Sequence, residues 1–138
     1  MHSDDEQSIW DIYNNSIISD PNIVWAGRGA KPLPLNTPIH VITACNPFEQ
    51  LLTDDENHQR NAALYAELIH LKVDINPVVG HSPDGDWQES SFAVHGLTRQ
   101  QACEIAKHYE QRGIFELTID ELLIIDVTNH QVKRRRAR

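Results

Sequence analysis

The chain has few cysteines and no long apolar run. Its 138 residues include two cysteines, Cys45 and Cys103, which excludes a framework of several disulfides and favours a reducing compartment. No apolar segment approaches the roughly 18 residues of a membrane-spanning helix. The first residues, MHSDDEQS, are acidic, whereas a signal peptide begins basic and then becomes apolar. We therefore expect a cytoplasmic protein that does not enter a membrane.

Motifs for metals and cofactors are missing as well. The eight histidines and two cysteines show neither HxxxH nor CxxC spacing, so we predict no metal site and no cofactor. The loop AGRGA at 26–30 lacks the Lys-Ser/Thr pair of a phosphate-binding loop. Cys45 follows a predicted strand and is either an activated thiol or a small packed residue. Whether the chain is an enzyme stays open, and no catalytic residue is assigned.

Positive charge is scarce before the last six residues. Residues 1–132 hold all 20 acidic and seven basic side chains, a net charge of −13, and residues 133–138 add five basic ones. An acidic body repels phosphate backbones, which leaves the basic tail as the one segment suited to nucleic acid. The tail contacts RNA, an acidic partner or its own body, or it is a solubilising end. We predict a single α+β domain over 1–132 and a basic disordered tail over 133–138, with no prediction of oligomeric state.

Three helix starts are clear. Capping boxes, in which a hydroxyl and a Glu or Gln satisfy each other's backbone amides, lie at 3–6, 53–56 and 98–101. Each precedes a helical pattern, and the three patterns cover about 4–18, 54–72 and 99–111. Gly113 is well placed to end the third.

Short β-branched or alternating segments predict the strands. They lie at 23–26, 38–44, 73–79, 89–96, 113–119 and 122–127. From residue 38 the order is strand, helix, strand, strand, helix, strand, strand, and the first six elements match a split βαβ plan. We predict an α+β fold with a ferredoxin-like sheet, an added C-terminal hairpin strand and an N-terminal helix.

The second helix carries polar residues on the face that should be apolar. Asn57 and Asn61 lie on one face with Leu64, Leu68 and Leu71, because their spacing alternates between four and three residues. Either this end of the helix projects past the sheet into water, or it lines a polar pocket. The preceding segment TACNP ends a predicted strand beside the helix N-terminus, a place that ligands favour. Acidic residues at 54–56 satisfy the helix dipole locally and weaken a phosphate-site interpretation.

Four segments in order resemble one protein family. ITACNP, ENHQRNAAL, VGHSPDGDWQESSFAVHGLTRQQA and EQRGIFEL, within about 38–119, are similar to small bacterial and phage-related proteins grouped as domain of unknown function 3293. Cys45 stands where that family often has an aromatic residue, and Glu110 stands where it often has glycine. Because the family name assigns no activity, the resemblance implies a site map and no reaction.

The motifs and the resemblance together predict a site for a small polar or anionic, possibly nucleotide-like, ligand at the start of the second helix. Its predicted members are Thr43, Asn46, Asn57, Arg60, Asn61, Glu89 and Ser91. Arg60 would hold an anionic group or form a bidentate pair with Glu89. Trp87 either covers the pocket mouth or packs on the sheet edge. The alternative is a protein-interaction module whose polar cluster is scaffold.

Overall fold

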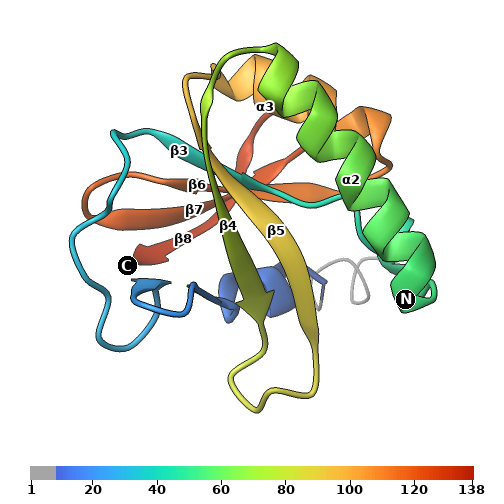
Figure 1. Cartoon of the computed structure of the whole chain (residues 1–138). Helices are drawn as coiled ribbons and strands as arrows, with labels where there is room; N and C mark the ends of the chain where they lie inside the picture. Colours follow the sequence, from blue (N-terminus) through green and yellow to red (C-terminus); the bar gives the residue numbers. More distant parts are fainter. Residues whose placement is uncertain (1–8) are drawn as a thin grey trace.

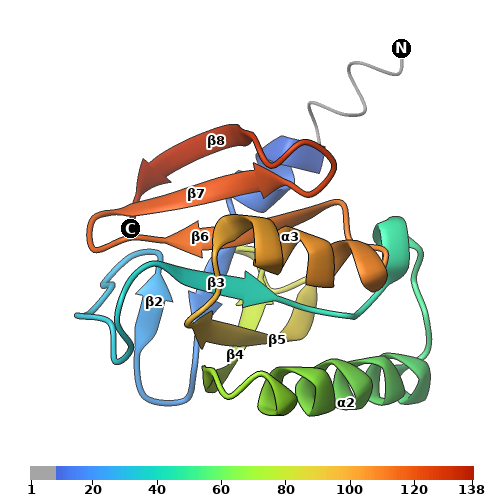
Figure 2. The same ribbon diagram turned by 90° about the horizontal axis from the view of Figure 1, so that it is seen from above.

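The computed structural model describes residues 9–138, which form one eight-stranded antiparallel sheet with helices on both faces (Figures 1 and 2). The strands are β1 (Ile17–Ser19), β2 (Val24–Ala26), β3 (Ile39–Ile42), β4 (Asp74–His81), β5 (Gln88–His95), β6 (Gly113–Leu117), β7 (Glu121–Asp126) and β8 (Val132–Ala137). Their order across the sheet is β2-β1-β4-β5-β3-β6-β7-β8. The helices are an N-terminal helix described over 9–14, the 3-10 helix η1 (Pro47–Glu49), α2 (Asp54–His70) and α3 (Arg99–His108).

The predicted ferredoxin-like split βαβ sheet is wrong. The structure is a curled, half-barrel sheet in which β1 and β2 extend one side and β8 extends the other. The predicted N-terminal helix also runs too far, because Ile17–Ser19 is strand β1 and pairs with both β2 and β4. A sheet of eight twisted strands curls, and here the curl encloses a second core that a smaller open sheet would lack.

The alternation of side chains along the central strands produces two cores. In β3, Ile39 and Val41 point to one face, and Ile42 points to the other. On the second of these faces, the core lies under α2 and α3 and includes Leu64 and Leu68. On the first face, the core lies against the N-terminal helix and is built from the residues Trp10, Ile18, Trp25, Phe115, Leu122 and Ile124. Both faces of the sheet are therefore covered.

Two capping boxes were predicted correctly. Thr53 and Glu56 cap α2 reciprocally, and Thr98 and Gln101 cap α3 in the same way. The third predicted box, at 3–6, lies outside the described residues. The starts of α2 and α3 are therefore fixed by local sequence.

The segment expected to be a disordered tail is strand β8 in the structure. It pairs with β7 from Glu121 to Ile125. Arg134 Nε donates to Asp11, Arg136 Nη2 donates to the Ser16 carbonyl, and Arg138 Nη2 donates to the Lys31 carbonyl. These three side chains attach β8 to the N-terminal helix and to the loop after β2. Most of the basic side chains of residues 133–138, which were expected to be free in solvent, therefore bind other parts of the same protein.

The end of α3 differs from the prediction based on Gly113. The helix ends at His108, and Glu110 adopts a left-handed conformation with φ 60°. The amide of Gln111 donates to the Ala106 carbonyl, and the amide of Glu110 donates to the Lys107 carbonyl, which together form a Schellman motif. Gly113 instead begins β6, where an added Cβ would lie 2.9 Å from the Trp10 ring.

Replacing Glu110 with glycine should stabilise the protein. A left-handed conformation costs a non-glycine residue about 1–2 kcal/mol, partly offset by the entropy of glycine in the unfolded chain. The half-exposed pair of Glu110 with Arg60, at 3.6 Å, contributes little. We expect Glu110→Gly to raise the free energy of unfolding in urea by about 0.5–1 kcal/mol. Glu104→Gly, in the middle of α3, is the control and should lower it by about 1 kcal/mol; a loss in both variants would contradict the strain at 110.

Candidate functional site

The polar end of α2 holds the loop that follows β3. Asn61 accepts a hydrogen bond from the Ala44 amide at 2.8 Å and donates to the Ser90 carbonyl at 2.9 Å. Its side chain is 8% exposed, and the Leu64 and Leu68 stripe continues below it. Asn61 therefore joins β3, α2 and β5, and an amide on the inner face is stable there because both its ends are satisfied.

A chain of amides leads from α2 to a carboxyl group. Asn57 accepts from the Asn46 amide at 2.9 Å and donates from Nδ2 to Asn46 Oδ1 at 2.9 Å. Asn46 Nδ2 then donates to Glu89 Oε2 at 2.8 Å. Asn46 has a φ of 47°, which asparagine tolerates better than most residues. The predicted residues Asn46, Asn57 and Glu89 thus lie together and fix the position of one carboxylate.

The expected pairing of Arg60 with Glu89 is not what the structure shows. Arg60 Nε donates to the Ala44 carbonyl and Nη2 donates to the Tyr109 carbonyl, each at 2.6 Å. These carbonyls end β3 and α3, so Arg60 connects the ends of two elements. The guanidinium donors of Arg60 that were predicted to bind a carboxylate therefore bind backbone carbonyls instead.

Thr43 and Ser91 are the remaining predicted members; Thr43 directly follows β3, and Ser91 lies in β5. Thr43 Oγ1 donates to the Ser90 carbonyl at 2.7 Å. Ser91 is buried, and its hydroxyl is 3.4 Å from the Glu89 carbonyl. Neither residue lines either of the two clefts described next, and the same is true of Arg60.

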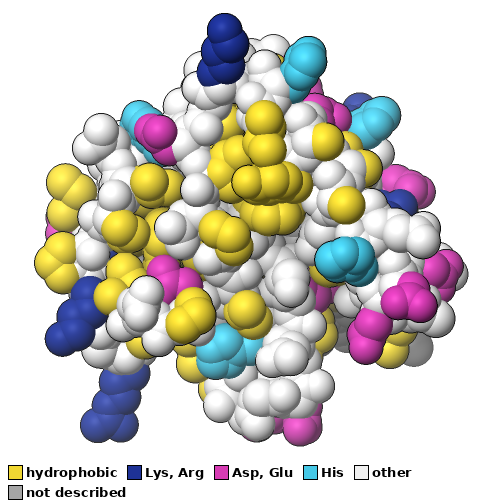
Figure 3. Space-filling model, in the orientation of Figure 1, with side chains coloured by type: hydrophobic (Ala, Val, Ile, Leu, Met, Phe, Trp, Pro, Cys, Tyr) yellow, Lys and Arg dark blue, Asp and Glu magenta, His cyan; other side chains and the backbone are white. Residues whose placement is uncertain are grey.

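The first cleft lies between α2 and the β4–β5 pair. Its volume is about 740 Å³, and hydrophobic side chains gather along this face (Figure 3). Tyr65 and Phe92 form an apolar wall with ring centroids 5.4 Å apart. The polar and charged lining consists of Asp54, Asn57, His58, Asn61, Gln88, Glu89 and Ser90. The cleft therefore combines aromatic rings with hydrogen-bonding groups, and it holds no lysine or arginine.

Glu89 is the most perturbed group in this cleft. Burial raises the pKa of its carboxyl to about 7, although the hydrogen bond from Asn46 acts in the opposite direction. Within the described residues, Asn46 is the only hydrogen-bond partner of this carboxyl. Burial also raises the pKa of the Cys45 thiol, so its environment is that of a packed residue, and the activated-thiol interpretation loses support.

A second cleft lies on the other side of Glu89. Its volume is about 380 Å³, and it is bounded by the N-terminal helix, η1 and the turn between β4 and β5. Trp87 lines this second cleft and not the first one. Two of the predicted site residues line this second cleft: Asn46, and Glu89, which lines the first cleft as well.

Sequence reasoning missed several lining residues. His58 and Tyr65 stand on the outward side of the α2 stripe, where exposed side chains are ordinary. They are separated by about two helical turns and therefore share one side of the helix, about a quarter turn from Asn57. That spacing was a usable signal for the cleft wall. Gln111, which donates to the Cys45 carbonyl at 3.0 Å and lines the second cleft, lies in the segment EQRGIFEL that resembles the family but was not among the predicted site residues.

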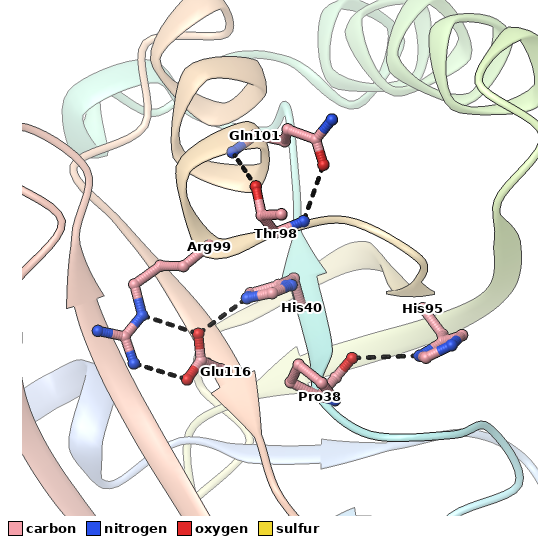
Figure 4. A network of polar contacts seen from close by, with 7 residues as sticks. All are labelled: Pro38, His40, His95, Thr98, Arg99, Gln101 and Glu116. Atoms are coloured by element: carbon pink, nitrogen blue, oxygen red, sulfur yellow. Dashed lines mark hydrogen bonds and ion pairs between the residues drawn. The ribbon is translucent and has the colours of Figure 1, made fainter.

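A partly buried charged network connects α3 to the sheet face that α2 and α3 cover (Figure 4). Arg99 donates to both Glu116 oxygens at 2.9 and 2.8 Å, and His40 Nε2 lies 2.9 Å from Glu116 Oε1. Burial alone would raise the pKa of Glu116, but the hydrogen bonds from Arg99 and His40 outweigh it and lower the pKa to about 2. Neither His40 nor Glu116 had been predicted, because each lies in a strand that reads as apolar.

The fold and the amide-anchored loop define a small α+β domain whose candidate site is at the start of a capped helix. A family model described as "Protein of unknown function (DUF3293)" matches residues 42–114, the region that holds this site. The chain belongs to that family. Comparison with curated proteins and with solved structures finds no match.

No helix within residues 9–138 is long and apolar enough to cross a membrane. The same residues contain no group of three or more His, Cys, Asp or Glu side chains placed to hold a metal ion.

Proposed function

We propose that the cleft between α2 and the β4–β5 pair binds a small polar ligand with a flat ring, of the nucleoside kind. The observation that carries this proposal is the position of Glu89, a carboxyl with a pKa of about 7 at the edge of a cleft walled by Tyr65 and Phe92. A desolvated carboxyl beside aromatic rings is suited to a ligand that stacks and donates hydrogen bonds.

The charges along this cleft favour an uncharged ligand over an anionic one. Asp54 and Glu89 line it, and no lysine or arginine does. Arg60, the residue expected to hold an anion, uses Nε and Nη2 on backbone carbonyls. A phosphate in the cleft would meet carboxylates without a paired cation, an unfavourable arrangement in a partly desolvated site.

The amides have a positioning role in this proposal. Asn57 and Asn61 accept hydrogen bonds from backbone amides of the loop that carries Asn46. Asn46 in turn donates to Glu89 and orients its carboxyl group. A carboxyl held in this way loses little side-chain freedom on binding, which favours affinity.

The test compares nucleosides with their own phosphates in a thermal-shift experiment. We would use adenosine, guanosine, cytidine and uridine, each beside its 5′-monophosphate. A nucleoside at ten times its Kd stabilises by about 1.4 kcal/mol, which raises Tm by roughly 3–6 °C. We expect at least one nucleoside to do so, more strongly than its monophosphate, with affinity falling from pH 8 to pH 6 as Glu89 takes up a proton.

Variants locate the binding. Glu89→Gln and Tyr65→Ala should each reduce the shift, and Ile119→Ala, at a residue that is 71% exposed and lines neither cleft, should leave it unchanged. Monophosphates that bind more tightly than nucleosides would overturn the uncharged-ligand proposal, and so would the absence of any shift at millimolar nucleoside.

The alternative function is a protein-interaction module, and one observation favours it. The hydrogen-bonding groups of Asn61 are taken up within the protein, which is the arrangement expected of scaffold. Exposed Tyr65 and Ile69, at 42% and 52%, then offer an apolar helix surface. A nucleoside shift abolished by Tyr65→Ala would decide against this alternative.

A further inference from the structure

The second cleft has a different lining from the first. Ile9, Ile12, Leu51 and Trp87 supply its apolar surface, and the Tyr13 ring joins them. Ile12 and Leu51 are 58% and 81% exposed, unusual values for side chains grouped around a hollow. Burying such surface under a ligand is favourable, and about 380 Å³ is the volume of a site for a small molecule.

All the charged residues that line this cleft are acidic. They are Glu49, Asp84, Asp86 and Glu89, with no lysine, arginine or histidine among the lining residues. Arg112 pairs with Glu49 at 2.8 Å, and Asp84 accepts from the Ser82 hydroxyl and the Asp86 amide. The Asp86 carboxylate receives no hydrogen bond from the described residues. The cleft keeps negative charge that the protein does not neutralise internally.

We propose that this second cleft binds a small organic cation with an apolar body, of the arylalkylamine class. The ammonium group would lie near Asp86 and Glu89, and the aromatic body would lie against Trp87. Carboxylates and an indole ring both attract an ammonium ion in a partly desolvated site, and the apolar wall accepts the rest of the ligand.

Charge complementarity selects this occupant over the chain's own first segment. Residues 1–8 contain Asp4, Asp5 and Glu6, which have the same sign as the cleft. The proposal does not rest on the first cleft, because only Glu89 lines both.

The test titrates the full chain with 2-phenylethylamine while recording amide NMR spectra, with 2-phenylethanol as the neutral control and phenylacetate as the anionic one. We expect the amine to shift amides of 84–89 and 46–51 and to bind at least roughly tenfold more tightly than the alcohol, the ratio for a cation held by a ring and carboxylates. Phenylacetate should not bind.

Matched variants separate the two clefts. Trp87→Ala and Asp86→Asn should each weaken the amine by several-fold, and Tyr65→Ala, which changes only the first cleft, should leave its affinity unchanged. Spectral dispersion confirms that each variant is folded, and Asp86→Asn at an exposed turn keeps the test usable if Trp87→Ala unfolds. Equal affinity for amine and alcohol, unaltered binding in both cleft variants, or no amine binding at millimolar concentration would each overturn the proposal.

Discussion

Replacing Glu116 with glutamine should lower the free energy of unfolding by about 3 kcal/mol, at the lower end of the cost of removing one partner from a buried ion pair. Glutamine keeps the volume, so the loss comes from the charge. Arg99 then loses a bidentate carboxylate, and the one amide oxygen of glutamine replaces the two carboxylate oxygens that Arg99 and the fully buried His40 share. Urea unfolding at pH 7 measures the change.

The same variant carries a pH signature. The folded-state pKa of Glu116 is about 2, below the ordinary value of 4.5, so its stabilisation is fully present above pH 4.5 and is lost as pH falls toward 2. The difference between wild type and Glu116→Gln should therefore be constant near neutrality and narrow below pH 4.5. Glu121→Gln, whose partner Arg135 lies 3.8 Å away at the surface, is the control and should change stability by less than about 0.5 kcal/mol. A similar loss in both variants would contradict a special role for the network.

Deleting residues 133–138 should destabilise the protein by at least about 3 kcal/mol, since several ladder hydrogen bonds are lost at about 0.5–1.5 kcal/mol each. The expected fall in Tm is roughly 10 °C or more. The deletion also turns β7, whose residues Leu122 to Ile125 are all buried, into an exposed edge strand that is prone to aggregation.

Point variants of β8 separate its inward and outward sides. Arg136→Ala removes a partly buried guanidinium that donates to the Ser16 carbonyl. It should account for a clear part of the stability that the deletion of 133–138 removes. Arg135→Ala, on the outward side, should cost less than about 0.5 kcal/mol. A deletion variant that melts like the full chain would instead mean that the last six residues behave as the tail predicted from composition.

Local signals in the sequence predicted the elements better than their assembly. The capping boxes at 53–56 and 98–101 located α2 and α3 because a cap depends on four adjacent residues. The edges of the sheet gave no such signal. β1 is three residues long, and β8 reads VKRRRA, a sequence without the apolar alternation by which a strand is recognised. The ferredoxin-like plan also fails within the predicted strands, because β3 pairs antiparallel with both of its neighbours, whereas a βαβ unit contains parallel strands.

The polar residues that interrupt the apolar stripe of α2 predicted that Asn57 and Asn61 lie near Glu89 at one helix end. The structure brings Asn57 and Glu89 together through Asn46, and their role in binding a ligand stays a prediction. The partner of Arg60 was not predictable, because the geometry of a guanidinium lets it donate equally well to backbone carbonyls and to carboxylates. Only the folded positions of Ala44 and Tyr109 decide between them.

The attachment of β8 to the opposite end of the chain bears on how fast the protein folds. Its arginine contacts join residues 107 to 123 positions apart, and closing such long loops costs entropy before any contact compensates for it. Chains dominated by distant pairings fold slowly, over milliseconds to seconds. Because β7 and β8 form a local antiparallel pair, we expect that pair to form sooner than the contacts that join β8 to the N-terminal helix and to the loop after β2.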